Sequence, residues 1–202
     1  MADSLALDDV GPLLQGRFGR PYRYADVTGS TQRLLEQDDP EGAVAVAEEQ
    51  TRGRGRLGRT WQAPARTSIL ASVLLRPAVD QTRLPELSLV AGRALAAAVT
   101  EVTGIEPTIK FPNDLLIGGR KVAGILAESS EGRVVLGIGV NVNQTRAELP
   151  ADAQTEPTSL RLELGETVNR AELLAAILLR LERAYDDWLG HDTACGCRSE
   201  GA

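Results

Sequence analysis

Lysine is almost absent from this sequence: of its 22 lysines and arginines, only Lys110 and Lys121 are lysines. An ammonium group is compact and strongly hydrated, whereas a guanidinium is planar and delocalised. We therefore interpret the two lysines as positions where a point charge meets a phosphate or a carboxylate. The alternative is that two lysines remain by chance in an arginine-rich chain.

Cysteine and histidine are scarce as well. Cys195 and Cys197 lie together near the C-terminus, and His191 is the single histidine. This set is too small for a four-ligand zinc site and excludes a disulfide framework, so we expect a reducing, cytoplasmic setting. A Ser-His-Asp or Cys-His mechanism is disfavoured. The acidic N-terminus does not resemble a signal peptide, and no hydrophobic run reaches membrane-span length, so no membrane partner is expected.

Aromatic residues make up only 3% of the chain, whereas 43% of it is hydrophobic. The core must therefore consist mainly of leucine, valine, isoleucine and alanine. The net charge of −6 argues against a general nucleic-acid-binding surface unless the positive charge is concentrated. A length of 202 residues fits one domain.

Hydrophobic patterning predicts short strands interrupted by helices. We expect residues 1–20 to be a loose lead-in, residues 21–190 to form one domain, and residues 191–202 to be a disordered tail. The expected strands span residues 22–27, 43–47, 67–76, 108–111, 115–117, 121–128 and 134–142. The expected helices span residues 31–38, 84–102 and 169–189, with Gly104 as a stop and Asn169 as a cap. Because hairpins fill the middle of the chain, an α+β fold with a mixed sheet and flanking helices is favoured.

The loop 51–61 carries Arg52, Arg54, Arg56 and Arg59 with three glycines and no acid. Glycine lets the backbone bend closely around a ligand, and arginine forks bind phosphate oxygens. This pattern is typical of a flexible flap that closes on an anion. A solvated surface loop and an RNA-contacting arginine–glycine segment are the alternatives. The window 53–58 matches G-x-G-x-x-G, but no helix is expected after it, so we reject a dinucleotide motif.

Several further segments join this loop into a recognisable set. They are Ser30-Thr31-Gln32, Glu49-Gln50-Thr51, Lys110-Phe-Pro-Asn-Asp114, Arg120–Glu128 with Gly124 inside it, and Gly137-Ile-Gly-Val-Asn-Val-Asn143. In this order the set closely resembles the catalytic domain of biotin protein ligases. The resemblance covers most of residues 22–190. It implies a fold like that of the class II aminoacyl-tRNA synthetases.

The resemblance implies an ATP- and Mg²⁺-dependent ligase. Biotin's carboxylate would attack the α-phosphate of ATP, and the biotinyl group of the resulting biotinyl-adenylate would pass to a lysine of a biotin carboxyl carrier protein domain. Three alternatives stay open, namely a lipoate-type ligase, a biotin-binding protein with impaired turnover, and an RNA-contacting arginine–glycine protein.

The resemblance also implies roles for individual residues. The implied catalytic residues are Lys121, Arg56 and Arg54. The implied biotin-binding residues are Ser30, Thr31, Gln32, Gln50, Arg54, Gly55, Arg56, Lys121 and Gly124. The implied ATP-binding residues are Arg56, Arg59, Trp61, Lys110, Asn113, Asp114 and Asn141, and Asp114 is the candidate Mg²⁺ ligand. Asp114 could equally cap a turn, and Trp61 could equally anchor the core.

This reaction needs positive charge because it brings two anions together. Two unit charges in contact repel by about 4 kcal/mol at an effective dielectric constant near 20. That energy corresponds to about three decades of rate. Arg54, Arg56 and Lys121 carry enough positive charge to reverse the sign.

The sequence departs from the family in a few places. Gln32 stands where asparagine is usual, Phe111 where tryptophan is more common, and Arg52 where a small residue is frequent. The first twenty residues are too few for the family's helix-turn-helix, so no DNA partner is expected. Residues 191–202 show no strand pattern, so the family's small C-terminal β-barrel is not expected either. Homodimerisation, which the family permits, stays open.

Overall fold

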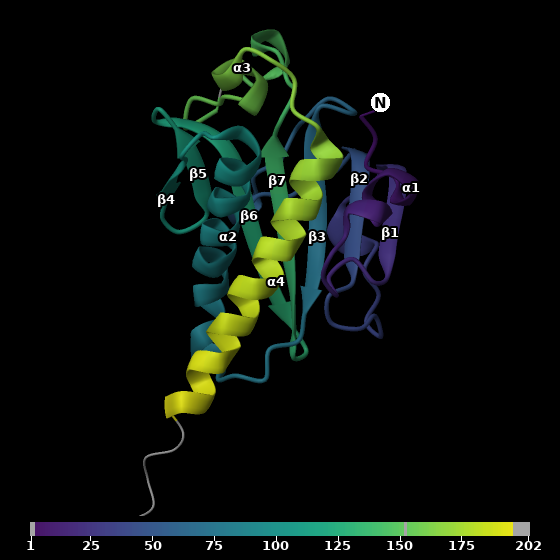
Figure 1. The fold of residues 1–202 in the computed structure, drawn as a ribbon, viewed down its shortest axis with the longest axis vertical. Coiled ribbons are helices and arrows are strands. Elements are labelled where there is room, and N and C mark those ends of the chain that lie inside the picture. Colours follow the sequence, from purple (N-terminus) through teal and green to yellow (C-terminus); the bar gives the residue numbers. More distant parts are fainter. Residues whose placement is uncertain (1–2, 152, 196–202) are drawn as a thin grey trace, which may run out of the picture.

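A seven-stranded mixed sheet forms the centre of the computed structural model, which describes residues 3–151 and 153–195 (Figure 1). The strand order is β1-β2-β3-β7-β6-β5-β4. β1 and β2 are parallel, and every other neighbouring pair is antiparallel. The strands are β1 (Tyr22–Thr28), β2 (Val44–Gln50), β3 (Ser68–Leu75), β4 (Thr108–Lys110), β5 (Asp114–Ile117), β6 (Arg120–Ser130) and β7 (Arg133–Asn141). The predicted mixed sheet is confirmed, and each expected strand lies within three residues of its predicted ends.

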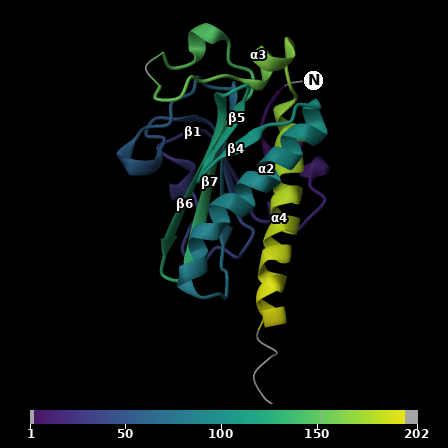
Figure 2. The same ribbon diagram turned by 90° about the vertical axis from the view of Figure 1, so that its left-hand side faces the viewer.

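Two long helices, α2 (Leu87–Thr103) and α4 (Arg170–Cys195), cover one face of the sheet (Figure 2). The buried residues of α2 recur at helical spacing, and Gly104 ends it with a left-handed φ of 73°. The side chain of Asn169 accepts hydrogen bonds from the backbone N–H groups of Ala171 and Glu172, which confirms it as the cap of α4. Across the described residues, no helix is both long enough and apolar enough to span a membrane.

The remaining helical elements are short. They are α1 (Leu7–Val10), α3 (Leu160–Leu164), and 3-10 turns at Gly11–Leu13, Thr31–Arg33, Arg56–Gly58, Gln81–Glu86 and Arg146–Glu148. The predicted helix over 31–38 is wrong, because only the single turn Thr31–Arg33 forms there. Leu34 and Leu35 are the only hydrophobic residues of that segment, so it has no apolar stripe to offset the cost of helix nucleation.

The expectation of a loose lead-in over residues 1–20 is also wrong for the described part. Leu5, Val10 and Phe18 are buried in the same core as α2 and α4. These apolar residues have no regular spacing, so periodicity could not reveal them. At the other end α4 continues to Cys195, beyond the helix end predicted at residue 189. Residues 196–202 lie outside the described part.

A buried ion-pair network ties the N-terminal segment to the last helix. The Arg170 guanidinium, which is fully buried, lies 2.6 Å from Glu48 Oε2 and 2.9 Å from Asp3 Oδ2. Its NH1 also donates to the backbone oxygen of Ser68 at 3.0 Å. Glu48 belongs to β2 and Ser68 to β3, so one side chain of α4 connects two central strands with the N-terminal residues. A buried pair of this kind is costly to break because the remaining charge stays desolvated.

We predict that Arg170→Ala lowers the free energy of unfolding by about 3–5 kcal/mol, since Glu48 would remain buried without its partner. The matched control is Arg180→Ala, which removes a half-exposed partner of Glu101 and should change stability by about 0–1 kcal/mol. Urea unfolding followed by circular dichroism measures both. Equal losses in the two variants would contradict the stabilising role of the buried network.

Candidate active site

Three glycines form the floor of the site on the sheet face opposite α2 and α4. Gly124 of β6 lies directly across from Gly139 of β7. A Cβ added at Gly139 would lie 2.6 Å from the indole of Trp61, and one at Gly124 would lie 2.9 Å from it. A Cβ at Gly137 would lie 3.2 Å from Nε2 of Gln32. Glycine is therefore required for Trp61 to lie flat against the sheet.

The arginine loop is closed over this floor. An isolated bridge pairs Arg54 with Thr60, and the N–H of Gly55 donates to the oxygen of Arg59 at 2.7 Å. β3, and no helix, is the next regular element after the loop, in agreement with rejecting a dinucleotide motif. Instead of an open flap, the loop is a small hairpin with its own backbone hydrogen bonds.

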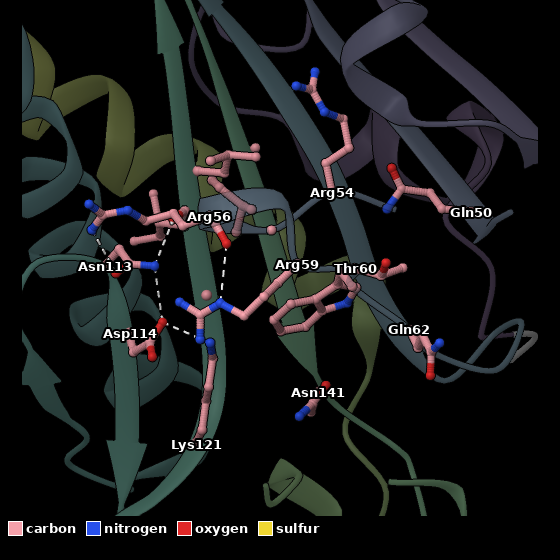
Figure 3. A pocket seen from close by; sticks show the side chains of 18 of the residues that line it. Gln50, Arg54, Arg56, Arg59, Thr60, Gln62, Asn113, Asp114, Lys121 and Asn141 are labelled. Atoms are coloured by element: carbon pink, nitrogen blue, oxygen red, sulfur yellow. Dashed lines mark hydrogen bonds and ion pairs between the residues drawn. The ribbon is translucent and has the colours of Figure 1, made fainter. Parts of the chain in front are cut away.

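Arg54 fastens the loop to β6 through a two-pronged ion pair. Its NH2 lies 2.7 Å from Oε1 of Glu128, and its NH1 lies 2.8 Å from Oε2. Figure 3 shows the Arg54 guanidinium turned away from Asp114 and Lys121. Both terminal nitrogens face one carboxylate, so in this structure Arg54 holds the loop in place. Its expected catalytic role stays a prediction.

Arg56 and Arg59 fasten the other side of the loop. The NH1 of Arg56 donates to Oδ1 of Asn113 at 3.0 Å (Figure 3). The NH1 of Arg59 donates to Oε1 of Gln154 at 3.0 Å. These partners are neutral amides, so both guanidiniums keep their net charge toward an anion in the pocket.

Lys121 lies at the centre of the charged end of the pocket. Its Nζ is 2.8 Å from Oδ1 of Asp114, as Figure 3 shows, and 5.6 Å from the centre of the Trp61 ring. Its backbone is held from the far side, because its N–H donates to Glu156 and its carbonyl accepts from Thr158. The ammonium is thus positioned by β6 and by the segment 156–158 together.

The opposite end of the pocket is polar but uncharged. Oε1 of Gln50 accepts from the N–H of Thr31 at 2.7 Å, and the Thr31 hydroxyl lies 2.7 Å from that of Ser72. The Nε2 of Gln32 and the Nε1 of Trp61 are buried and have no hydrogen-bond partner in the described part of the chain. Buried N–H donors without partners are costly, so these two point to a ligand that supplies acceptors.

Together these groups line a cavity of about 460 Å³. Fourteen of the fifteen site residues expected from the sequence line it, namely Ser30, Thr31, Gln32, Gln50, Arg54, Gly55, Arg56, Arg59, Trp61, Asn113, Asp114, Lys121, Gly124 and Asn141. Lys110 does not line it; its Nζ instead donates to the hydroxyl of Thr155 at 3.0 Å. Four cationic side chains and one carboxylate therefore face the cavity of a chain whose net charge is −6.

Sequence reasoning missed part of the wall. Ser72 lines the cavity from β3, and Gln154, Thr155 and Pro157 line it from the segment that follows β7. Ser72 did leave a signal, because it is a polar residue inside an otherwise apolar strand. Residues 153–157 left none, since they form no helix or strand and carry no motif, and only the tertiary fold brings them to the cavity wall of Lys121.

A permanent metal site is not built into these residues. Within residues 3–151 and 153–195, no group of three or more histidine, cysteine, aspartate or glutamate side chains could hold an ion. Asp114 is the single carboxylate in the cavity wall, and its Oδ1 already contacts Lys121 and Nδ2 of Asn113. One carboxylate with phosphate oxygens is a donor set that suits Mg²⁺ entering with a nucleotide.

Curated relatives agree with the resemblance seen in the sequence. The bifunctional ligase/repressor BirA of Bacillus subtilis is 39% identical over 182 residues, which are 86% of this chain and 56% of that protein. The chain thus spans little more than half the length of that relative. A biotin–[acetyl-CoA-carboxylase] ligase of Mycobacterium tuberculosis is 42% identical over 183 residues, which are 84% of this chain and 67% of that protein.

Solved structures agree as well. The Aquifex aeolicus biotin protein ligase in complex with biotin and ATP superposes with a TM-score of 0.76 at 35% identity, covering 83% of this chain and 71% of that one. This likeness confirms the fold expected from the sequence. Residues 24–144 match the biotin/lipoate A/B protein ligase family. The chain therefore belongs to the biotin/lipoate A/B protein ligase family.

Proposed function

We propose that this chain catalyses ATP-dependent biotinylation. Biotin's carboxylate oxygen attacks the α-phosphorus of MgATP, forming biotinyl-5′-AMP and releasing pyrophosphate. A lysine amine of a biotin carboxyl carrier protein domain then attacks the acyl carbon, loses a proton to solvent, and releases AMP with the electrons of the broken acyl–oxygen bond. The observation that carries this proposal is a single cavity with an uncharged hydrogen-bonding end and a cationic end.

The uncharged end favours biotin over lipoate. Biotin's ureido ring carries a carbonyl acceptor and N–H donors, which can pair with Thr31, Gln32 and Ser72. Lipoate's dithiolane ring offers only weak sulfur acceptors. With lipoate bound, the buried N–H groups of Gln32 and Trp61 would stay unpaired, at a cost of about 1–3 kcal/mol each.

The cationic end would hold the reacting anions. The Lys121 ammonium is balanced by Asp114, whose Oδ1 lies 2.8 Å from its Nζ. When the two substrates enter, the ammonium can turn to the carboxylate and α-phosphate oxygens, where negative charge gathers in the transition state. Arg56 would contribute a second cation from the loop. Asp114, freed from Lys121, is then the residue we propose for the Mg²⁺ that accompanies ATP.

Arg59, Asn113 and Asn141 complete the proposed ATP side, and Trp61, whose ring centre lies 5.6 Å from the Nζ of Lys121, borders both ends of the cavity. Asn141 is almost fully buried, and its side chain donates to the oxygen of Thr158 and accepts from Gln144. It is therefore held rigidly in the wall. Lys110 does not line the cavity, and we place it at the edge of this side, because its ammonium donates to Thr155, which does line the cavity.

We propose residues 3–190 as the catalytic unit, a carrier domain as the protein partner and the cytoplasm as the location. The test is incubation of the chain with biotin, MgATP and labelled pyrophosphate. Biotin-dependent exchange of label into ATP supports the proposal, and lipoate-dependent exchange without biotin-dependent exchange would replace it with the lipoate reaction. Absence of exchange with tight biotin binding would favour a binding protein.

Lys121→Ala should lower the rate of biotin-dependent exchange by roughly 100- to 1000-fold, because the transition-state charge loses its nearest ammonium. Arg93→Ala is the matched control, since it removes an exposed cation from α2 far from the cavity lining. Its exchange rate should stay within about twofold of the parent, as expected for a charge outside the site. Thermal melting confirms that both variants fold. Normal exchange by Lys121→Ala would contradict the proposed role.

Ser72→Ala tests the uncharged end of the cavity. Removing this hydroxyl takes a polar group from the cavity wall and leaves the Thr31 hydroxyl with only Oε1 of Gln50, at 3.2 Å, among its present partners. We expect KM for biotin to rise roughly 5- to 30-fold, equivalent to about 1–2 kcal/mol, while KM for ATP stays unchanged. Steady-state exchange kinetics separate the two constants. A rise in KM for ATP alone would place biotin elsewhere.

A charge swap tests whether Arg54 acts through Glu128. Arg54→Glu should raise KM for both substrates, because two carboxylates would face each other and open the loop. The double variant Arg54→Glu/Glu128→Arg should recover at least part of the loss, since the ion pair is restored with reversed polarity. Exchange kinetics measure the recovery. If the double variant is as impaired as Arg54→Glu, the guanidinium contacts substrate directly.

A further inference from the structure

We call the loops 51–61 and 111–113, which carry the cavity-lining residues Arg56 and Asn113, the mouth of the cavity. Two large apolar side chains of the mouth are exposed to an unusual degree. Of the exposed large hydrophobic side chains in the described residues, Leu57 at 90% and Phe111 at 77% are the most exposed. Leu57 lies in the turn Arg56–Gly58, and Phe111 lies between β4 and β5. Neither lines the cavity. Their apolar surface therefore serves neither the core nor the pocket.

The backbone at Leu57 makes its exposure more informative. Its φ of 57° and ψ of 38° lie in the left-handed region, which glycine and asparagine adopt more readily than leucine. A leucine here carries a conformational cost without burying its side chain in this chain. Exposed apolar groups at such a place are typical of a surface that another molecule covers.

The two side chains belong to loops that are fastened together over the site. Arg56 precedes Leu57, Asn113 follows Phe111 by two residues, and the Arg56–Asn113 hydrogen bond of 3.0 Å joins the loops (Figure 3). The outer side of the arginine loop, Leu57 included, also lines a second, open hollow of about 550 Å³ together with residues 126–128. The mouth therefore offers two apolar protrusions and a hollow beside one of them.

The charges around these protrusions indicate the chemistry of the partner. Arg52, Arg56 and Arg59 are exposed on the loop of Leu57, and Lys110 is exposed next to Phe111. This cationic rim repels a lone lysine ammonium and attracts carboxylates. A protein that brings a lysine into the cavity must offset that repulsion with acidic neighbours.

We propose that Leu57 and Phe111 form the docking surface for the acceptor protein, a folded domain that presents its lysine beside apolar side chains and carboxylates. This inference rests on the proposed function, because only the second step of that reaction requires a protein to reach the cavity. Docking at the mouth aims the acceptor amine at the acyl carbon beside Lys121. The first step, with small-molecule substrates, does not need this surface.

The variants are designed to remove apolar surface and leave the loops intact. Leu57→Asn deletes the apolar side chain and keeps a residue that tolerates the left-handed backbone. Phe111→Ser deletes the second protrusion, and the double variant combines them. Val27→Ser is the matched control, because Val27 is 57% exposed on β1 and does not line either hollow.

Two assays read the two steps separately. In biotin-dependent pyrophosphate exchange without acceptor, all variants should stay within about twofold of the parent, as expected of exposed residues outside the reacting site. With a purified biotin carboxyl carrier domain, KM for the carrier should rise roughly 5- to 30-fold in each single variant and further in the double variant, with kcat at saturation unchanged, as for truncated interface anchors. KM for the carrier should also rise with salt in the parent.

Several outcomes would overturn the docking proposal. One is a carrier KM within twofold of the parent in the double variant. Another is a parallel loss of exchange, which would place the side chains in the first step. If carrier kinetics are unchanged but light scattering shows altered self-association of the variants, the surface belongs to contacts with a second copy of the chain. If the parent exchanges pyrophosphate but transfers no biotin to the carrier, the carrier domain is not its acceptor. Absence of exchange in the parent would instead refute the proposed function itself.

Discussion

The close approach of the arginine loop to the sheet depends on the glycines of β6 and β7. A side chain at Gly124 or Gly139 would collide with Trp61, and the indole could not lie against the strands. Trp61 ends the loop, so its position sets where Arg56 and Arg59 meet the cavity. Two missing side chains thus let the loop bring Arg56 and Arg59 to the cavity wall that they share with Lys121.

Positive charge is concentrated in the cavity wall, although the chain as a whole is negatively charged. The chain has a net charge of −6, yet four cations and one carboxylate line the cavity. Each cation has a contact within the protein: Arg54 with Glu128, Lys121 with Asp114, and Arg56 and Arg59 with amides. Substrate anions would therefore replace existing contacts. The loss of these contacts offsets part of the binding energy, which limits how tightly any one anion is held.

The two faces of the sheet do different work. One face packs against α2 and α4 and contains the main core, which Arg170 closes at the N-terminal end with Glu48 and Asp3. The other face carries the loops of the site. Since β2 and β3 are buried nearly along their whole length, the strands that bear the site are held from both sides. Loops can then position reactive groups because the strands below them are packed into the core.

The sequence by itself determined the strands, the two long helices, Gly104 and Asn169 as helix ends, and most residues that line the cavity. These features are local, because apolar spacing, capping residues and the order of the motifs can all be recognised in the sequence alone. The packed N-terminal segment, the cavity wall at 153–157 and the place of Ser72 in the cavity were decided only by the tertiary structure. Their contacts join residues far apart in the chain, such as Asp3 with Arg170, and no local pattern encodes such a pairing. The same holds for Lys110, which lies across from Asp114 in the β4–β5 pair, yet its ammonium contacts Thr155, a residue far along the chain.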